Sequence, residues 1–423
     1  MDTSAPPTYP SANVAQRFTA RISDLSRGGA GIAHSPDGKV VFVPFTAPGD
    51  LVEIEIISDA KSYRQGKLVR LVEPSTERVA PRCPIFGQCG GCSWQHLSYE
   101  RQFQTKVAGV RYALKRLGVD LTGVNEFDER PALNPWNYRN RVQLRGFQDQ
   151  LGFFAAQSHE IVAVDQCEIA RKEINQVWSA TREEGRSLSE PYKVEVEVTE
   201  SGEIRRAWNQ GHAAFGFRQV NDEQNAVLQR LVKEYVCAGF ERGGDSGTEG
   251  GPAVTVAAPA NFSRILYDLF GGQGNFAALF AGEDGLELFG KVFCVDVGAP
   301  DNRGDSSVPR GLAAAVKFVR SPVKPWLLRE AARVAKGSGG GHVAIIDPPR
   351  TGLDRDVLAI SDSLKKLGVT EIVTVGCDPD SWASDLSRFT KQGWRVERVG
   401  AVDLFAQTVH VESVARLVLS TAD

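Results

Sequence analysis

Hydrophobic and polar residues alternate in short runs along the first part of the chain, and glycine, proline or aspartate separates one run from the next. Short runs of this kind with turn residues between them are typical of the strands of a small closed β-barrel. Five of them follow one another: Phe18–Leu25, Ala30–His34, Lys39–Phe45, Asp50–Ser58 and Lys67–Glu73. We therefore expect a barrel over residues 15–75, preceded by a disordered tail over residues 1–14, which are rich in Pro, Ser and Thr.

The pattern changes after the barrel. Residues 140–220 return to short strands and turns, which indicates a β-rich part of a central domain over residues 76–212. Glu223–Tyr235 then has the periodicity of a helix, and later apolar runs such as Val292–Asp296 resemble buried parallel strands. We expect a multidomain α/β protein whose last domain, over residues 213–423, is doubly wound.

Two of the apolar runs end on residues that carry chemistry. Val373–Val375 leads through Gly376 to Cys377, and Val343–Ile346 is followed by Asp347. The carboxyl ends of parallel strands meet at the edge where such sheets bind ligands, so Cys377 is a candidate nucleophile and Asp347 a candidate partner. A single cysteine at the end of a strand is more often a small core residue than a nucleophile. Only the neighbouring motifs favour a catalytic role for Cys377.

A glycine-rich turn follows another apolar run. Ile265–Leu269 continues into Phe270-Gly271-Gly272-Gln273-Gly274-Asn275. Glycines after a strand let a ligand approach the backbone closely, as a nucleotide-type cofactor requires. An ordinary tight loop is the alternative for these residues taken alone.

Composition and charge narrow the class of protein. A chain of 423 residues is expected to hold two to four domains. The net charge is −3, yet Lys61–Arg145 contains fifteen Lys or Arg against seven Asp or Glu, which indicates either a phosphate-binding face or a solvated basic surface. The first thirty residues lack a signal-peptide stretch and no run of eighteen apolar residues occurs, so we expect a cytoplasmic protein without membrane spans.

Three cysteines lie close together in the sequence. Cys83, Cys89 and Cys92 have C-x5-C-x2-C spacing with glycines between them, and Cys167 can complete a set of four thiolates. The chain has seven cysteines, and in a cytoplasmic protein this uneven distribution favours metal ligation and catalysis over disulfides. A [4Fe–4S] cluster and a structural zinc both accept four thiolates, and the spacing alone does not separate them.

Taken together, these motifs resemble one family. Leu25–Ala33 and Pro44–Asp50 resemble a TRAM domain, an OB-like barrel that binds oligonucleotides. The cysteine pattern, continued by Ser93-Trp94-Gln95-His96, resembles that of the S-adenosylmethionine-dependent RNA uridine-5-methyltransferases. Further motifs of this family are matched by Phe215–Asn221, Ile265–Phe276, Asp347–Leu353, Gly376–Pro379 and Asp403–Ser413. The resemblance implies a TRAM barrel, a central α+β iron–sulfur and RNA-binding domain, and a Rossmann-like methyltransferase domain.

The resemblance also implies roles for individual residues. Cys377 is expected to be the nucleophile and Glu412 the proton acceptor. The cofactor-binding residues carried over from the family are Gln219, Phe270, Asn275, Asp296 and Asp347. The ligands of a [4Fe–4S] cluster carried over in the same way are Cys83, Cys89, Cys92 and Cys167, with zinc as the alternative metal.

The chain departs from the family's pattern at several positions. Gly271 stands where the family has a cysteine, Asp296 where it has a glutamate, and Ala406 where it has a proline. A serine replaces the later arginine of the nucleophile motif, and Val297–Pro309 lacks the family's helix pattern.

The predicted reaction is the transfer of a methyl group from S-adenosylmethionine to C5 of a uridine in RNA, through a covalent cysteine–uracil adduct. Ribosomal RNA is the expected partner because the ribosomal branch of the family carries both the cluster and the TRAM domain, and transfer RNA is the alternative. Two other hypotheses are a non-catalytic RNA-binding or ribosome-assembly factor and a cytosine-5 methyltransferase. No obligate protein partner is expected.

Overall fold

The computed structural model describes residues 16–124, 126–211, 214–216, 218–241, 264–281, 288–300, 310–333 and 340–420. The expected tail over residues 1–14 and most of the divergent stretch Val297–Pro309 lie outside the described residues. The chain divides into two compact units. Unit 1 contains Met1–Thr105, Phe153–Val162 and Gln407–Val409, and unit 2 contains Lys106–Gly152, Ala163–Ala406 and His410–Asp423.

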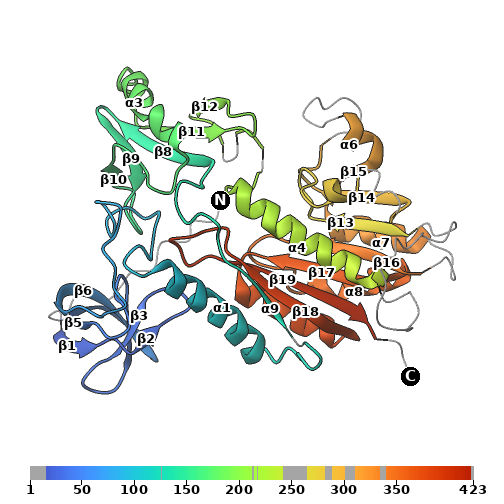
Figure 1. Cartoon of the computed structure of the whole chain (residues 1–423), viewed down its shortest axis with the longest axis horizontal. Coiled ribbons are helices and arrows are strands. Elements are labelled where there is room, and N and C mark those ends of the chain that lie inside the picture. Colours follow the sequence, from blue (N-terminus) through green and yellow to red (C-terminus); the bar gives the residue numbers. More distant parts are fainter. Residues whose placement is uncertain are drawn as a thin grey trace, which may run out of the picture. The chain divides into compact units, whose positions relative to one another are not determined.

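Unit 1 contains the barrel, which is drawn in blue in Figure 1. Over residues 17–73, all of which are described, its six strands are β1 (Arg17–Arg21), β2 (Asp24–Leu25), β3 (Gly31–His34), β4 (Val40–Val43), β5 (Leu51–Asp59) and β6 (Tyr63–Glu73). They are ordered β1-β5-β6-β4-β3-β2, so the two edge strands follow one another in the chain.

The chain changes its pairing partner between β1 and β2. Ile22 N donates to Asp50 O beside β5 (2.8 Å), and Ser23 N donates to Ile32 O on β3 (2.8 Å). This change closes the sheet into the expected barrel, and it explains why the single run Phe18–Leu25 forms two strands where one was expected. Alternate residues face inward, and they build a core from Ile22, Ala33, Val41, Val43, Val52 and Ile54.

The second sheet occupies the expected β-rich region. Among the described residues its strands are β8 (Arg141–Phe147), β9 (Gln150–Phe154), β10 (Ile161–Ala163), β11 (Tyr192–Val198) and β12 (Ile204–Trp208), in the order β10-β9-β8-β11-β12. Two short helices, α2 (Lys172–Gln176) and α3 (Trp178–Arg186), pack against β11 and β8. Glycine is required at Gly146 and Gly185, because a Cβ at either would lie about 2 Å from the Tyr192 side chain.

The third sheet is the largest and lies in unit 2. Its strands among the described residues are β7 (Phe127–Arg130), β13 (Ile265–Leu269), β14 (Lys291–Asp296), β15 (Val316–Arg320), β16 (His342–Ile346), β17 (Val369–Gly376), β18 (Trp394–Val402) and β19 (Glu412–Leu419). The order is β15-β14-β13-β16-β17-β19-β18-β7. The pairs from β15 to β17 are parallel, whereas β19 is antiparallel to both of its neighbours.

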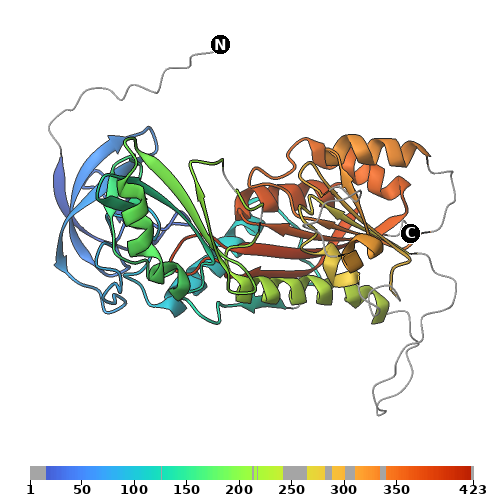
Figure 2. The same ribbon diagram turned by 90° about the horizontal axis from the view of Figure 1, so that it is seen from above.

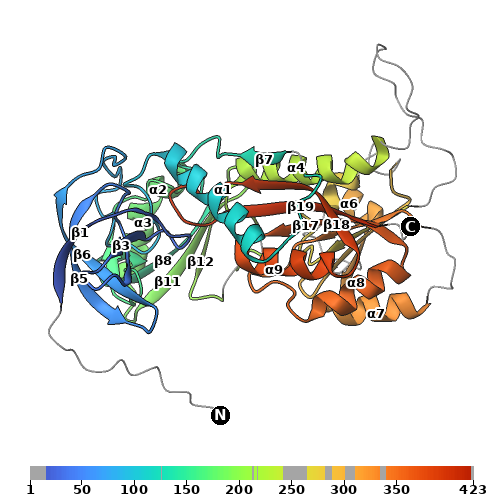
Figure 3. The same cartoon turned by 90° about the horizontal axis from the view of Figure 1, so that it is seen from below.

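Helices cover both faces of this sheet, as expected for a doubly wound fold. Figures 2 and 3 show α4 (Asp222–Glu241) along one face, and α7 (Val323–Arg333), α8 (Asp356–Lys366) and α9 (Pro379–Thr390) along the other. The remaining helical elements are α1 (Tyr99–Arg116), the short helix η1 (Ala277–Phe280) and α6 (Arg310–Ala315). Burial on both faces explains the continuous apolar run Val343–Ile346 of β16. No helix in the described ranges is long and apolar enough to span a bilayer.

The order of the strands reverses between β13 and β16. Loops at the carboxyl ends of these two strands diverge to opposite sides, which opens a crevice for a ligand at this point of the sheet. The turn beginning at Phe270 and the segment beginning at Asp347 both start there. The fold therefore places the glycine-rich turn beside the acid predicted to face the same pocket.

Candidate active site

The glycine-rich turn after β13 has a backbone conformation that lets a ligand approach the main chain closely. Phe270 has φ 63°, and Gly272 and Gly274 have φ 54° and 88°, so three positions adopt a left-handed conformation. A Cβ at Gly271 would lie 2.7 Å from the Asp268 carboxylate and from the Cys294 sulfur. The Cys294 thiol therefore fills the space that a side chain at position 271 would need, which accounts for glycine where the family has cysteine.

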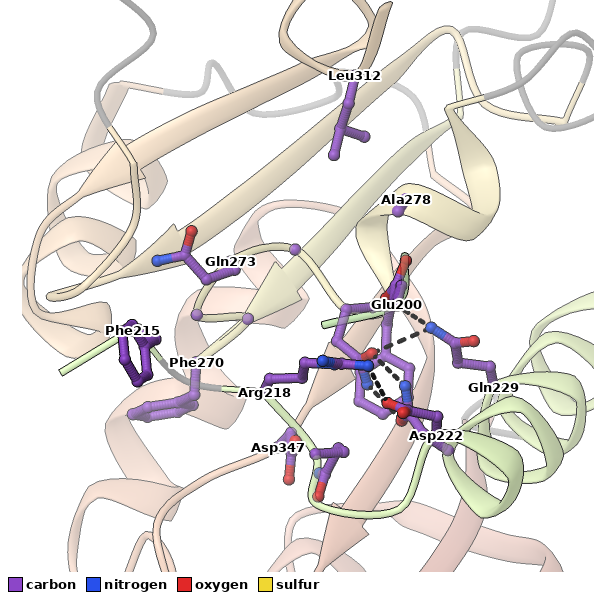
Figure 4. Close-up of a pocket in the computed structure, with 18 of the residues that line it drawn as sticks. Glu200, Phe215, Arg218, Asp222, Gln229, Phe270, Gln273, Ala278, Leu312 and Asp347 are labelled. Atoms are coloured by element: carbon purple, nitrogen blue, oxygen red, sulfur yellow. Dashed lines mark hydrogen bonds and ion pairs between the residues drawn. The ribbon is translucent and has the colours of Figure 1, made fainter. Parts of the chain in front are cut away.

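A cavity of about 1020 Å³ opens beside this turn, at the upper end of the range for ligand sites. Its lining includes Gln219, Phe270, Asn275 and Asp347, which are four of the five residues predicted to bind the cofactor. Figure 4 shows the Phe215 ring next to the Phe270 ring, with Arg218 and Asp347 on the same side of the turn. An aromatic and carboxylate lining of this kind suits a ligand with a planar ring and a positive charge.

Asn275 is held by helix α4. Its Oδ1 accepts from Asn225 Nδ2 (2.9 Å) and from Gln229 Nε2 (3.0 Å), and its Nδ2 donates to Asn225 Oδ1 (3.1 Å). Because these bonds occupy most of the amide, Asn275 shapes the cavity wall together with α4.

A buried asparagine fixes the segment that carries Gln219. Asn140 Nδ2 donates to Gln219 O (2.9 Å) and to Asp222 Oδ1 (2.7 Å), and Asn140 N donates to Val220 O (2.8 Å). Arg218 Nη2 also binds Asp222 (2.6 Å). The entry to α4 is thus held in place on the side of the cavity.

Buried carboxyl groups gather below the turn. Burial, followed by the charge of Asp296, raises the pKa of Asp347 to about 7. Burial also raises the pKa of Asp268 to about 7, with further contributions from the charges of Asp347 and Asp296. Asp268 Oδ2 accepts from Ala277 N (2.8 Å), whereas its buried Oδ1 has no hydrogen-bond partner. Asp296, the fifth predicted cofactor residue, ends β14 and accepts from Gly298 N (2.6 Å).

Cys377 lies between the end of β17 and the start of α9. The Asp378 carboxylate caps this helix by accepting from Asp380 N (3.1 Å) and Ser381 N (2.9 Å), so Cys377 directly precedes a helix N-terminus. Burial, and then the charge of Glu412, raises the pKa of the Cys377 thiol to about 11, while the Arg350 guanidinium acts in the opposite direction. The resting site therefore holds a neutral thiol.

Glu412 begins β19 and is fully buried. Pairing of Gly376 with Ser413 places it beside the end of β17. Burial, and then the charge of Asp347, raises the pKa of the Glu412 carboxyl to about 8, and Arg350 opposes that shift. The charge of Glu412 acts on Cys377, and the charge of Asp347 acts on both Glu412 and Cys377. The fold therefore brings the predicted nucleophile, the predicted base and the pocket acid to one place.

The glycine before the nucleophile has no room for a side chain. A Cβ at Gly376 would lie 2.7 to 2.9 Å from Trp382, whose Nε1 donates to Thr374 Oγ1 (3.0 Å). Replacing Gly376 by Ala is expected to destabilise the protein by about 1–3 kcal/mol and to displace Cys377. Chemical denaturation measures the loss of stability, and the methylation rate measures the displacement of Cys377. Gly38→Ala is unsuitable as a control, because φ at Gly38 is 86° and alanine would be strained there. Gly28→Ala, where the nearest atom is 3.9 Å away, serves instead, and equal stability of the two variants would contradict the prediction.

The cysteine motif forms a tight turn in unit 1. The Cys89 sulfur accepts from Gly91 N (3.4 Å), and the charge of Cys83 contributes, after burial, to a raised pKa of the Cys89 thiol. Gly90 is required because a Cβ there would lie 3.2 Å from Phe154 O. Among the described side chains, no three metal-ligating groups are close enough to hold a metal ion, and Cys167 belongs to unit 2.

Protein-family models match two parts of this chain. A TRAM domain model matches residues 12–69, and a model described as tRNA (Uracil-5-)-methyltransferase matches residues 340–419. An RNA methyltransferase of Brucella suis is 31% identical over 435 residues, which covers 94% of this chain and 96% of the relative. The chain belongs to the RNA (uracil-5-)-methyltransferase family. The expected family and enzyme class are therefore confirmed.

Two further relatives of this uracil-5 methyltransferase have more specific names. The 23S rRNA (uracil(1939)-C(5))-methyltransferase RlmD of Shewanella halifaxensis is 26% identical over 453 residues, covering 96% of each chain. The structure of the Pyrococcus abyssi tRNA (uracil-54, C5)-methyltransferase in complex with S-adenosyl-L-homocysteine has a TM-score of 0.64 at 22% identity, covering 95% of this chain and 99% of that one. This structural likeness confirms the fold.

The residues present in this methyltransferase fit S-adenosylmethionine. Phe270 and the glycine turn offer a planar ring and close backbone approach, and the carboxyl of Asp347 offers a negative charge to a cationic donor. Sequence reasoning did not find the residues that hold these groups, notably Asn140, Asn225 and Gln229. Only the tertiary contacts show that Asn140 holds the segment that carries Gln219.

Proposed function

We propose that this enzyme methylates C5 of a uridine in ribosomal RNA through a covalent adduct between the Cys377 sulfur and C6 of the uracil ring. The observation that carries the proposal is the convergence of Cys377, Glu412 and Asp347 beside a cavity suited to the methyl donor. This combination provides a nucleophile, a base and a donor site within one part of unit 2.

The chemistry assigns one task to each group. Addition of the Cys377 thiolate to C6 makes C5 an enolate-like carbon, which forms the new bond to the methyl group. Bound S-adenosylmethionine would supply that methyl group from its positively charged sulfur, and the bond between the methyl carbon and that sulfur would break to leave a neutral thioether. Glu412 then accepts the proton from C5, the bond between C6 and the Cys377 sulfur breaks, and the pyrimidine double bond re-forms.

Cys377 is a neutral thiol before the ligands bind, and it has to lose its proton before it can attack the uracil ring. Because burial and Glu412 raise the pKa of the thiol to about 11, formation of the thiolate needs additional positive charge near Cys377. Arg350 and the N-terminus of α9 supply part of it. A cationic donor in the adjacent cavity supports the ionised forms of Asp347 and Glu412 in the same way.

The RNA is proposed to bind through the TRAM barrel and the basic segment Lys61–Arg145, mostly through its phosphates. The target base has to leave its stack to reach Cys377, which is partly exposed, and Glu412, which is buried. Ribosomal RNA is favoured over transfer RNA by the similarity to the 23S rRNA enzyme along nearly the whole chain.

The substrate is tested with a tritiated methyl donor and separate transcripts of 23S ribosomal RNA and transfer RNA, followed by mass spectrometry of the nucleosides. We expect 5-methyluridine in ribosomal RNA. Label in transfer RNA would reassign the substrate, and 5-methylcytidine would change the target base. Binding of RNA without any methyl transfer would support the alternative of a non-catalytic assembly factor.

We further propose that Cys83, Cys89 and Cys92 bind a [4Fe–4S] cluster, with Cys167 as the predicted fourth ligand and zinc as the alternative. The C-x5-C-x2-C spacing and the N–H···S bond to Cys89 support this site. No step of methyl transfer passes through it.

Anaerobically purified protein is expected to contain about four iron and four sulfide ions per chain. Cys89→Ser should lower the metal content and loosen residues 83–96, while cofactor affinity stays within about twofold because the cavity lies in unit 2. Elemental analysis and calorimetry measure the two. Cys237→Ser is the control, since this cysteine lies on α4, outside the motif. Zinc without sulfide would identify the alternative metal.

A further inference from the structure

The loop that leads to Glu412 passes through both compact units. Strands β18 and β19 form a hairpin that closes at the pair Val402 and Glu412, so residues 403–411 are its loop. Gln407–Val409, at the tip of the loop, belongs to unit 1, whereas the residues before and after belong to unit 2. The proposed base therefore lies three residues after a segment that is folded into the unit containing the TRAM barrel.

Within unit 2, hydrogen bonds hold each of the first four residues of the loop, residues 403–406. Asp403 Oδ1 accepts from Lys106 Nζ (2.7 Å), and both side chains are fully buried. Lys106 Nζ also donates to Phe405 O (3.1 Å), Asn221 Nδ2 to Leu404 O (3.2 Å), and Tyr138 OH to Ala406 O (3.0 Å). This end of the loop is thus fixed on its own unit.

Within unit 1, the tip is held chiefly by one glutamine of α1. Gln102 Nε2 donates to Gln407 Oε1 (3.0 Å), and Gln102 Oε1 accepts from Gln407 N (3.0 Å). Gln102 Nε2 also donates to the carbonyl groups of Trp94 and Leu97, both at 3.0 Å. Gln102 is 1% exposed, so its amide makes these bonds out of contact with water.

Backbone and packing contacts complete the anchor. Gln407 O accepts from Ser93 N (2.9 Å) and Trp94 N (3.1 Å). Val409 packs against a cluster of Leu25, Ala47, Trp94 and Leu97. Gly29 makes room for it, because a Cβ there would lie 2.4 Å from Val409 Cγ1.

Gln407 is also in an unfavourable backbone conformation, with φ 69°. This left-handed conformation is strained for a non-glycine residue, and it persists only where surrounding contacts enforce it. Here Gln102, Ser93 and Trp94 supply those contacts. The conformation of the loop before Glu412 is therefore set by unit 1.

We propose that Gln102 and Gln407 are positioning residues for proton removal from C5, because their reciprocal hydrogen bonds fix the loop tip from which the chain returns to Glu412. This inference rests on the proposed role of Glu412 as the base. It assigns to unit 1 a task in the last chemical step, separate from RNA binding. Loss of the anchor is expected to slow resolution of the covalent adduct more than its formation, since Cys377 lies on a different strand.

The test uses the full-length protein and RNA labelled with tritium at C5 of uridine, under single-turnover conditions. In Gln102→Met, we expect the adduct to form nearly as in wild type and tritium release to slow by about 10–100-fold, the range for a base displaced by a fraction of an ångström to an ångström. Cofactor affinity should stay within about twofold. Hydrogen exchange should accelerate across residues 403–412.

Two variants complete the design. Gln104→Met is the matched control. Gln104 is exposed on the same helix, and its Nε2 donates to Glu100 Oε1 (3.3 Å), one turn away and outside the loop. Gln407→Asn tests the same link if Gln102→Met folds poorly, because asparagine tolerates a left-handed conformation and is one methylene shorter.

The outcomes separate cleanly. Slow tritium release with a persisting adduct in Gln102→Met or Gln407→Asn, and wild-type behaviour in Gln104→Met, supports the positioning role. Wild-type release in the first two variants overturns it, as does an equal loss of adduct formation, cofactor affinity and release. A wild-type enzyme that neither forms an adduct nor releases tritium would instead overturn the proposed function, and this inference with it.

Discussion

Cys377→Ala is expected to abolish methyl transfer, with a loss of at least about 10⁴-fold, because no other thiol stands at the end of β17 to activate C5. Addition to C6 is the step that gives C5 its nucleophilic character, and alanine offers no lone pair for it. The fold should survive the change, since the Cys377 side chain is partly exposed and Asp378 still caps α9.

The measurement uses RNA in which the target uridine is replaced by 5-fluorouridine. Fluorine does not leave C5 as a proton does, so the wild-type enzyme is expected to remain bound to the RNA as a methylated adduct that denaturing gels and mass spectrometry detect. The adduct should be absent in Cys377→Ala. Cys294→Ala is the control for a buried thiol near the cofactor turn, and adduct formation by Cys377→Ala would remove this residue from the mechanism.

Glu412→Gln is expected to reduce turnover by about 10²–10⁴-fold while still forming the methylated adduct, because glutamine fills the same space but accepts no proton. The variant should therefore accumulate enzyme joined to ordinary uridine-containing RNA, which the wild type releases. Asp385→Asn is a suitable control, since Asp385 is another buried acid that serves a structural role by accepting from Leu353 N (2.7 Å). A lack of adduct in Glu412→Gln would show that the residue acts earlier than proton removal.

The pH dependence follows from the raised pKa of Glu412, about 8, in which burial is the largest contribution. A base acts in its ionised form, so the rate of tritium release from the preformed methylated adduct should rise about tenfold per pH unit below pH 8 and level off above it. Because the pKa of Glu412 is raised, most of the carboxyl is protonated at neutral pH and cannot accept the proton from C5, so activity increases with pH. The rate in Glu412→Gln should not follow this titration.

The sequence determined which chemistry the chain carries. Strands that are buried on both faces have to be apolar throughout, so runs such as Val343–Ile346 identified the sheet and placed Asp347 and Cys377 at its carboxyl edge. Turn glycines and short alternating runs located the barrel, because left-handed turns and half-buried strands restrict residue choice locally. Motif resemblance supplied the roles of Glu412 and Gln219, which isolated residues do not reveal.

The tertiary structure decided how those groups are held. The Trp382 side chain occupies the space beside Gly376, and the Cys294 sulfur occupies the space beside Gly271. Only the folded structure shows which side chain lies against each glycine. The pairs Gln102–Gln407 and Asn140–Gln219 connect residues far apart in the chain through hydrogen bonds, which leave no periodicity or spacing in the sequence. The raised pKa values of Cys377 and Glu412 likewise arise chiefly from burial. Local sequence specifies strands, turns and reactive groups because these depend on neighbouring residues, whereas positioning and protonation depend on contacts that exist only in the folded chain.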